Sequence, residues 1–245
     1  GIVIGIMTLL LLIPGAMIES LIYERQQRSV ETIQKINEKW SNAQTVNGPF
    51  LVIPYQIRTV DEKKNVFVEK FNFYLTPEVL KINAGLTPEE RHYGIYKSIL
   101  YKSNLEFAGN FKDPLPCLPQ NAEIIWNEVQ VRIGITDLRG ISNNMNFSFN
   151  GVSATAEAGG GQDAIGQGLV ILLKNSESLI AGKKATFNCT LKLNGSADIN
   201  FVPVGKSTQV QMNGLWKSPG FIGSFTPEYS LNDTGLVATW NVFHV

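Results

Sequence analysis

Two stretches decide the fold: IYKSILYKSNLEFAGNF at residues 95–111 and ATFNCTLKLNGSADINF at residues 185–201. In both, apolar side chains occupy most odd positions. Polar side chains occupy most even positions of the first stretch and nearly all even positions of the second. A period of two over such a length predicts one long strand, or two collinear strands, with one buried and one solvated face. One-sided burial is typical of antiparallel sheets, and two such sheets packed face to face form a sandwich. We therefore predict a mainly β protein whose body is an antiparallel β-sandwich.

The body also carries signs of an internal repeat. FSFNGVSATA at residues 147–156 is similar to YSLNDTGLVATW at residues 229–240, because each has an aromatic residue, Ser, an apolar residue and Asn, then Gly and an Ala-Thr pair. This similarity predicts two related β-lobes at residues 45–156 and 157–245, although short β motifs also match by chance. We interpret the Gly-rich segment AGGGQDAIGQG, residues 158–168, as a flexible connection between the lobes.

The N-terminal segment is apolar and then abruptly charged. Residues 1–18 carry no charge, and as a helix they would span about 27 Å, close to the ~30 Å thickness of a hydrocarbon core. A signal peptide would have a shorter apolar region and an exit of small residues, which fits poorly here. We predict a transmembrane anchor at residues 1–18 and a solvated helical stalk at residues 19–44 with one side lying on the following domain. Because the chain lacks an initial Met and ends on an apolar strand pattern, we expect a piece of a longer protein.

Composition argues against several classes of function. Lys and Arg number 21, as do Asp and Glu, so no net charge draws the chain to nucleic acid. Cys117 and Cys189 either form one disulfide or remain unpaired thiols, and with two His they are too few to suggest a zinc site. VGKST at residues 204–208 is similar to the end of a phosphate-binding loop, but Asn200 stands where that motif needs Gly. We therefore expect no metal and no cofactor.

Short charged motifs suggest turns more than catalysis. TPEER at residues 87–91 predicts the start of a short helix, because Thr can cap it and Pro takes its first position. Asp137 and Arg139 predict a loop ion pair that fixes a turn. Neither His is accompanied by a nucleophile motif. A carboxylate pair for sugar hydrolysis stays open, because the separation of two carboxylates is not visible in a sequence.

Six blocks, taken in order, resemble the CreD family of bacterial inner-membrane proteins, and the resemblance covers nearly the whole chain. The blocks are IESLIYERQQR, WSNAQTVNGPFLVIPY, PEERHYGIYKSILYKSNLEFAGNF, GITDLRGI, FVPVGKSTQVQM and FIGSFTPE. The resemblance implies an N-terminal anchor in the lipid bilayer, a large periplasmic domain and further transmembrane helices after it. It also implies a link to cell-envelope integrity and to the response to β-lactam stress, and it brings no enzymatic activity and no catalytic residue.

Positions within these blocks are the candidate functional or docking residues. They are Glu24, Arg25, Trp40, Gln44, Gly48, Pro49, Pro54 and Tyr55. The alternative is that they only dock the stalk onto the first strand. We expect a non-enzymatic protein that binds an envelope component or a membrane protein partner, with its oligomeric state left open. The alternatives are a periplasmic carbohydrate- or peptidoglycan-binding or hydrolysing module and an envelope sensor.

Overall fold

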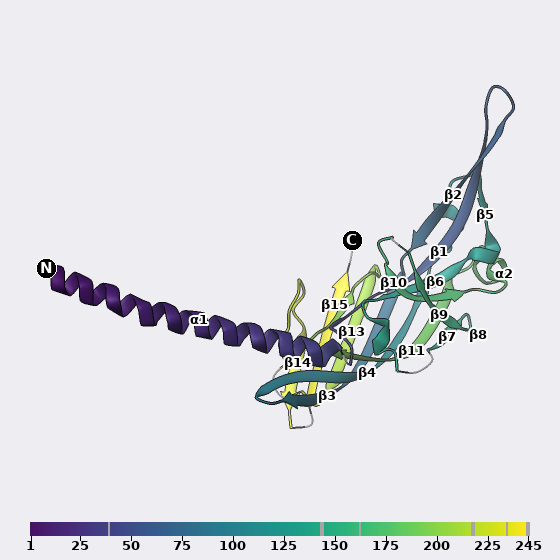
Figure 1. The fold of residues 1–245 in the computed structure, drawn as a ribbon. Coiled ribbons are helices and arrows are strands. Elements are labelled where there is room, and N and C mark those ends of the chain that lie inside the picture. Colours follow the sequence, from purple (N-terminus) through teal and green to yellow (C-terminus); the bar gives the residue numbers. More distant parts are fainter. Residues whose placement is uncertain (39, 143–144, 162, 217–218, 234, 244–245) are drawn as a thin grey trace.

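One long helix leads into two β-sheets (Figure 1). The computed structural model describes residues 1–245 with the exception of residues 39, 143–144, 162, 217–218, 234 and 244–245. Helix α1 (Ile2–Glu38) extends away from the sheets over most of its length. Among the described residues, no helix combines the length and the apolar character that crossing a membrane requires. The anchor at residues 1–18 stays a prediction.

The first sheet has seven strands in the order β12–β1–β6–β10–β9, and β2 and β5 also pair with β1. The pair β1–β12 is parallel, whereas the other pairs are antiparallel. Its strands are β1 (Gln44–Val60), β2 (Val66–Leu75), β5 (Ala122–Ile124), β6 (Gln130–Ile135), β9 (Ala156–Gly160), β10 (Gln167–Leu172) and β12 (Ile199–Val202).

The second sheet has eight strands in the order β14–β15–β13–β3–β4–β11–β7–β8, with β13 and β3 parallel. Its strands are β3 (Val79–Tyr93), β4 (Tyr96–Phe111), β7 (Asn146–Phe149), β8 (Val152–Ala154), β11 (Ala185–Ser196), β13 (Ser207–Gly214), β14 (Glu228–Asn232) and β15 (Gly235–Phe243). The connections hold the short helix α2 (Ser176–Ile180) and three 3-10 turns, η1 (Leu115–Cys117), η2 (Trp126–Glu128) and η3 (Leu138–Gly140).

Both sheets direct apolar side chains into one shared core. Leu51 and Ile133 of the first sheet belong to the same buried cluster as Leu105 and Phe187 of the second. Phe187 also packs against Phe111 with ring centroids 5.1 Å apart. The mainly β prediction is thus confirmed, while the two parallel pairs make the sheets mixed where we predicted antiparallel ones.

The two alternating stretches have different outcomes. Residues 95–111 contribute the single strand β4, whose burial follows the predicted alternation from Tyr101 to Phe107. Before Tyr101 the prediction is wrong, because Ile95 and Ile99 are exposed whereas Ser98 and Leu100 are buried. Residues 185–201 divide into β11 of the second sheet and β12 of the first, so the expectation of collinear strands is wrong. The chain changes sheets at Ala197, which adopts a left-handed backbone conformation with φ 58°. The side-chain period continues through this point and therefore gives no sign of the crossing.

TPEER is strand, and the predicted helix start is wrong. Residues 87–91 belong to β3 and pair with β4, with Thr87 opposite Lys102. Pairing with β13 reaches only Leu86, so Pro88 lies where β3 has one neighbouring strand and a missing N–H is tolerated. Cross-strand ion pairs, such as Lys97 with Glu90 at 2.7 Å, accompany the pairing. Tertiary pairing here overrides a local capping signal.

The boundaries of the stalk and of the Gly-rich connection also differ from prediction. Helix α1 ends at Glu38, and Gln44 already begins β1. Only the end of α1 reaches the body, where the Ser98 hydroxyl donates a hydrogen bond to Asn37 at 2.6 Å, so the stalk does not lie along the domain. Most of residues 158–168 belongs to the β9–β10 hairpin, because its glycines allow close strand pairing.

Both predicted lobes contribute strands to both sheets. Strand β1 pairs with β12, and β4 pairs with β11, so a boundary between residues 156 and 157 does not separate the sheets. The two similar segments form the hairpins β7–β8 and β14–β15 at opposite ends of the second sheet. That the two lobes are related by an internal repeat stays a prediction.

Candidate functional site

The candidate residues fall into three places. Glu24 and Arg25 lie on the exposed part of α1, where Glu24 pairs with Arg28 at 2.6 Å. Trp40 and Gln44 lie where α1 leads into β1. The other candidates occur farther along β1, namely Gly48, Pro49, Pro54 and Tyr55. The structure therefore groups only Trp40 and Gln44 into one site, at the root of α1.

Gln44 is the centre of a buried polar group that we call the junction cluster (Ser41, Gln44, Asp137 and Asn194). The Gln44 side-chain amide nitrogen donates to the Ser41 hydroxyl at 2.8 Å and to the Asp137 and Asn194 carbonyls at 2.9 and 3.1 Å. Its carbonyl oxygen accepts from the Asp137 backbone N–H at 3.2 Å. Since a buried amide is costly unless it is bonded, these contacts fix the start of β1 against both sheets.

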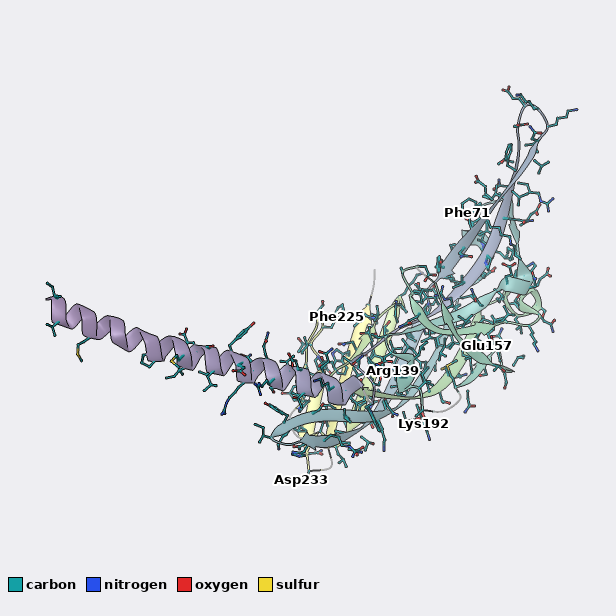
Figure 2. All side chains as sticks on the ribbon, viewed as in Figure 1. Phe71, Arg139, Glu157, Lys192, Phe225 and Asp233 are labelled. Atoms are coloured by element: carbon teal, nitrogen blue, oxygen red, sulfur yellow. The ribbon has the colours of Figure 1, made fainter. Side chains whose placement is uncertain are left out.

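Asp137 ties the same cluster to the residues after α1. Its carboxylate accepts from the Asn42 backbone N–H at 3.0 Å and from Arg139, whose guanidinium lies 2.6 Å away. The bond from Arg139 holds the pKa of Asp137 well below its ordinary value, although burial acts in the opposite direction. Figure 2 shows Arg139 close to the end of α1. The predicted loop ion pair is confirmed, and it also takes part in the junction.

Two glycines leave no spare room in the junction. A Cβ added to Gly140 would lie 2.3 Å from the Asn194 carbonyl oxygen and 2.5 Å from the Gln44 amide nitrogen. A Cβ on Gly195 would lie 2.2 Å from the Tyr101 hydroxyl oxygen. The junction is therefore closed by shape as well as by hydrogen bonds.

Trp40 immediately precedes Ser41 of the junction, at the root of α1. The Lys102 ammonium lies 5.7 Å from the centre of its ring, within the range of a cation–π contact. Among the described residues, neither the Trp40 indole N–H nor the Ser196 hydroxyl has a hydrogen-bond partner, although both atoms are buried. Buried polar groups are bonded in the great majority of cases, so this pair is unusual.

An apolar groove opens beside the junction, between β12 of the first sheet and β13 and β15 of the second. It consists of two hollows of about 170 and 110 Å³. Both hollows are lined by Ile199, Asn200, Met212, Ile222 and Trp240. Residues 219–225 form the outer wall, and the Trp240 indole N–H holds this segment by donating to the Phe225 carbonyl at 3.2 Å. Ile222, in that wall, is 84% exposed.

The candidates farther along β1 lie away from this groove. Gly48 and Pro49 are buried within β1, where its pairing with β6 shifts register. The Tyr55 ring stacks on Phe71 of β2 with centroids 5.5 Å apart. Figure 2 shows Phe71 on the β1–β2 hairpin, which projects from the body. These positions do not share a site with Gln44.

A second polar group lies on the outer side of the first sheet, and we call it the outer clamp (Tyr74, Arg132 and Asp163). The buried Arg132 pairs with Asp163 and donates to the Gly166 carbonyl at 2.7 Å. The Tyr74 hydroxyl donates to Asp163 at 3.0 Å. Burial alone would raise the pKa of Asp163, but the bonds from Arg132 and Tyr74 outweigh it and lower the pKa. The clamp fixes the β9–β10 turn against β2 and β6.

Sequence reasoning missed most of the junction. It treated Tyr101 and Asn194 as ordinary strand positions and gave Asp198 no role. The inward Tyr101 was one available signal, since a buried hydroxyl needs a partner, here the Asp198 carbonyl at 2.7 Å. Gly195 was another, because Gly within an alternating run indicates a close approach.

The cysteines and the possible metal ligands lie apart in the part of the chain that the structure describes. Within the described ranges, no group of three or more His, Cys, Asp or Glu side chains is placed to hold a metal ion. Cys117 and Cys189 are both free thiols, the first exposed and the second buried. Burial raises the pKa of Cys189 to about 12. Strand β13 follows the VGKST turn, where a phosphate-binding loop would need a helix.

The fold and the site define a β-sheet protein of two mixed sheets, carried on a projecting N-terminal helix that a buried polar junction holds at its root. The family model described as "Inner membrane protein CreD" matches residues 1–245. The chain belongs to the CreD family of inner membrane proteins.

A curated relative and solved structures were also similar. Inner membrane protein CreD of Escherichia coli (strain K12) is 30% identical over 237 residues, which cover 95% of this chain and 52% of that protein. The chain thus spans about half the length of this relative. An M1 zinc metallopeptidase of Deinococcus radiodurans matches with a TM-score of 0.32 at 10% identity, over 68% of this chain and 38% of that one. A likeness this weak carries no argument about function.

Proposed function

We propose that this chain is a non-enzymatic inner-membrane protein that is anchored by residues 1–18 and supports cell-envelope integrity and the response to β-lactam stress. In this proposal α1 holds the β body in the periplasm. The body then binds an envelope component or a membrane protein partner.

The observation that carries the proposal is the exposed apolar surface at the start of α1. Ile2, Val3 and Met17 are 82%, 73% and 69% exposed, and no charge occurs before Glu19. Apolar surface of this kind is stabilised by transfer from water into hydrocarbon. From Glu19 to the end of α1 the helix would hold the body about 30 Å from the bilayer.

Binding by the body is supported by the apolar groove and its rim. Ile222 and Phe225 of the groove wall expose apolar surface next to Tyr229 of β14. Apolar patches that gather around a hollow mark interaction sites more often than scattered apolar residues do. Among the described residues that line the groove, Asp198 is the one carboxylate, whereas sugar hydrolysis needs two. The groove therefore favours binding over the hydrolytic alternative.

The two cysteines allow a direct test of this arrangement. Cys117 is exposed on the β body, whereas Cys189 is buried and its raised pKa keeps the thiol protonated. We expect a membrane-impermeant maleimide to label Cys117 in bacteria whose outer membrane alone has been permeabilised. We also expect the full chain to stay with membranes after an alkaline carbonate wash.

Matched variants separate the outcomes of this test. Cys117→Ser should abolish labelling, because Cys189 stays protected until the protein is denatured. Labelling that requires lysis of the inner membrane would place the body in the cytoplasm and overturn the topology. Release of the chain by the carbonate wash would overturn the anchor.

A further inference from the structure

The segment that crosses from β11 to β12, residues 196–200, has two different sides. One side belongs to the apolar groove, because Ile199 and Asn200 line both of its hollows and Asp198 lines one. The other side faces the residues that follow α1. We call residues 196–200 the crossing segment. The crossing segment thus borders the groove through residues 197–200 and the junction through Ser196 and Asp198.

Hydrogen bonds join the junction side of the crossing segment to the root of α1. The Asp198 carbonyl accepts from the Gln44 backbone N–H at 3.0 Å and from the Tyr101 hydroxyl at 2.7 Å. The Ser196 backbone N–H donates to the Asn42 carbonyl at 3.3 Å. Burial raises the pKa of Tyr101, so its hydroxyl remains a donor at ordinary pH. A shift of the crossing segment therefore strains the bonds that position β1 and the end of α1.

Two observations indicate that the crossing segment is not in its most relaxed arrangement. Ala197 holds a left-handed backbone conformation, φ 58°, that side chains other than Gly, Asn and Asp seldom adopt. The buried Ser196 hydroxyl and Trp40 indole N–H, on the two sides of the junction, lack hydrogen-bond partners among the described residues. A second arrangement that relaxes the Ala197 backbone, or gives either buried group a hydrogen-bond partner, would offset part of the free-energy cost of shifting the crossing segment.

We propose that the crossing segment couples the apolar groove to the orientation of α1. Displacement of Ile199 and Asn200 by an occupant of the groove changes the angle at which α1 leaves the body. By linkage, a change at the root of α1 alters access to the groove to the same extent. This inference rests on the proposed function, because α1 must be attached to the membrane for its orientation to matter. In that case the body acts as a sensor whose output is the orientation of α1.

The length of α1 amplifies a small change at its root. A helix of 37 residues is about 55 Å long, so a rotation of about 10° moves its far end by roughly 10 Å. The Asn37 side chain, which accepts from the Ser98 hydroxyl at 2.6 Å, is near the pivot. Displacements too small to disturb the core are enough to reorient the helix.

The first arm of the test fills the groove and measures α1. In the full chain with Cys117→Ser, spin labels at Arg25→Cys and Glu106→Cys report the distance from the exposed part of α1 to the exposed face of β4, while Cys189 stays buried. Met212→Trp fills the groove from β13, and Ser224→Trp fills it from the outer wall. We expect either variant to shift the mean distance by about 3 Å, the displacement that a 10° rotation gives at residue 25.

A matched control lies one residue away. Gln211 is exposed on the opposite face of β13, so Gln211→Trp adds the same side chain outside the groove and should leave the distance unchanged. If both groove-filling variants fold, as judged by unchanged circular dichroism, and keep the parental distance, the coupling is wrong. An equal shift in Gln211→Trp would also overturn it.

The second arm reverses the direction of the measurement. Tyr101→Phe removes the hydroxyl that bonds the Asp198 carbonyl and keeps the ring. We expect the thiol of Asn200→Cys, in the groove wall, to react with N-ethylmaleimide about fivefold faster in the Tyr101→Phe variant than in the parent. The thiol of Gln211→Cys should react at the same rate in both. Equal rates at residue 200 in both backgrounds would refute reciprocity. Both arms are measured on the purified chain. Failure of the coupling can therefore be distinguished from failure of the proposed function, which the maleimide topology test examines.

Discussion

The junction cluster and the outer clamp are two polar groups that differ in burial and in what holds them together. The junction joins residues up to 150 positions apart, chiefly through the neutral Gln44 amide, and the Asp137 carboxylate adds one ion pair at its edge. Two glycines close the junction against any added atom. The clamp holds a charged pair, and its Asp163 side chain is still 24% exposed. A site closed by shape is sensitive to one added methyl group, whereas a site held by charge tolerates added volume better than loss of a bond. The comparison implies that the junction responds chiefly to changes of shape and the outer clamp chiefly to the loss of a bond.

The largest expected effect comes from adding one methyl group to the junction. Gly140→Ala places a Cβ within 2.5 Å of the Gln44 amide nitrogen and 2.3 Å of a backbone oxygen, which cannot move without shifting β11. We expect the free energy of unfolding to fall by about 3 kcal/mol. Urea unfolding of the detergent-solubilised full chain, followed by tryptophan fluorescence, measures it. Gly220→Ala in the groove wall is the control, because nothing lies within 4 Å of its added Cβ. Equal stability of the two variants would break the contrast between closed and open sites.

A smaller effect, and a pH dependence, follow from Asp137. Its folded-state pKa is held low chiefly by the bond from Arg139, so the carboxylate stabilises the fold above the ordinary carboxyl pKa of about 4. That stability is lost as the pH falls below this value. We expect Asp137→Asn to lower the free energy of unfolding by about 2 kcal/mol at pH 7, mainly because the hydrogen bond from the Asn42 N–H is weakened. The ion pair with Arg139 contributes less, because the Arg139 side chain is largely exposed to solvent.

Measurements at pH 7 and pH 3 distinguish this effect from a general loss of packing. The difference between parent and Asp137→Asn should shrink at the lower pH, since the parent carboxylate loses part of its advantage there. Asp233→Asn, at an exposed carboxyl in the β14–β15 turn, should show no difference at either pH. A deficit of Asp137→Asn that is the same at pH 7 and pH 3 would contradict the charge-based account of this half of the junction.

The sequence predicted the elements of the body better than their arrangement. Alternation in β4 and β11 is a local property of each strand, and it identified the buried side chains of β11 and those of β4 from Tyr101 onward. The same alternation runs on into β12, because a side-chain period says nothing about which sheet a strand joins. TPEER failed for the related reason that its cross-strand partners lie about ten residues away and outweigh a local cap.

The candidate site could be predicted only in part. Trp40 and Gln44 were identified from the family resemblance, and Asp137 only as half of a loop ion pair. Their meeting depends on contacts between residues 93 positions apart, and Asn194 is 150 positions from Gln44. No local pattern encodes which buried carbonyl an amide will reach. The outer clamp was missed likewise, because its Gly-rich turn was interpreted as a flexible connection.

The smallest expected effect concerns the outer clamp and tests whether it is held by charge. Tyr74→Phe removes one bond to Asp163 and leaves the pairing with Arg132 in place. Because Tyr74 is partly exposed, we expect a loss of only about 0.5–1 kcal/mol in the free energy of unfolding. The pKa of Asp163 should rise, since Tyr74 is one of the donors that lower it, and carboxyl NMR titration measures this. Tyr55→Phe is the control, because the Tyr55 ring stacks on Phe71 and keeps that contact without its hydroxyl. If Tyr74→Phe cost as much as Gly140→Ala, the clamp would depend on shape no less than the junction, and the contrast between the two groups would be lost.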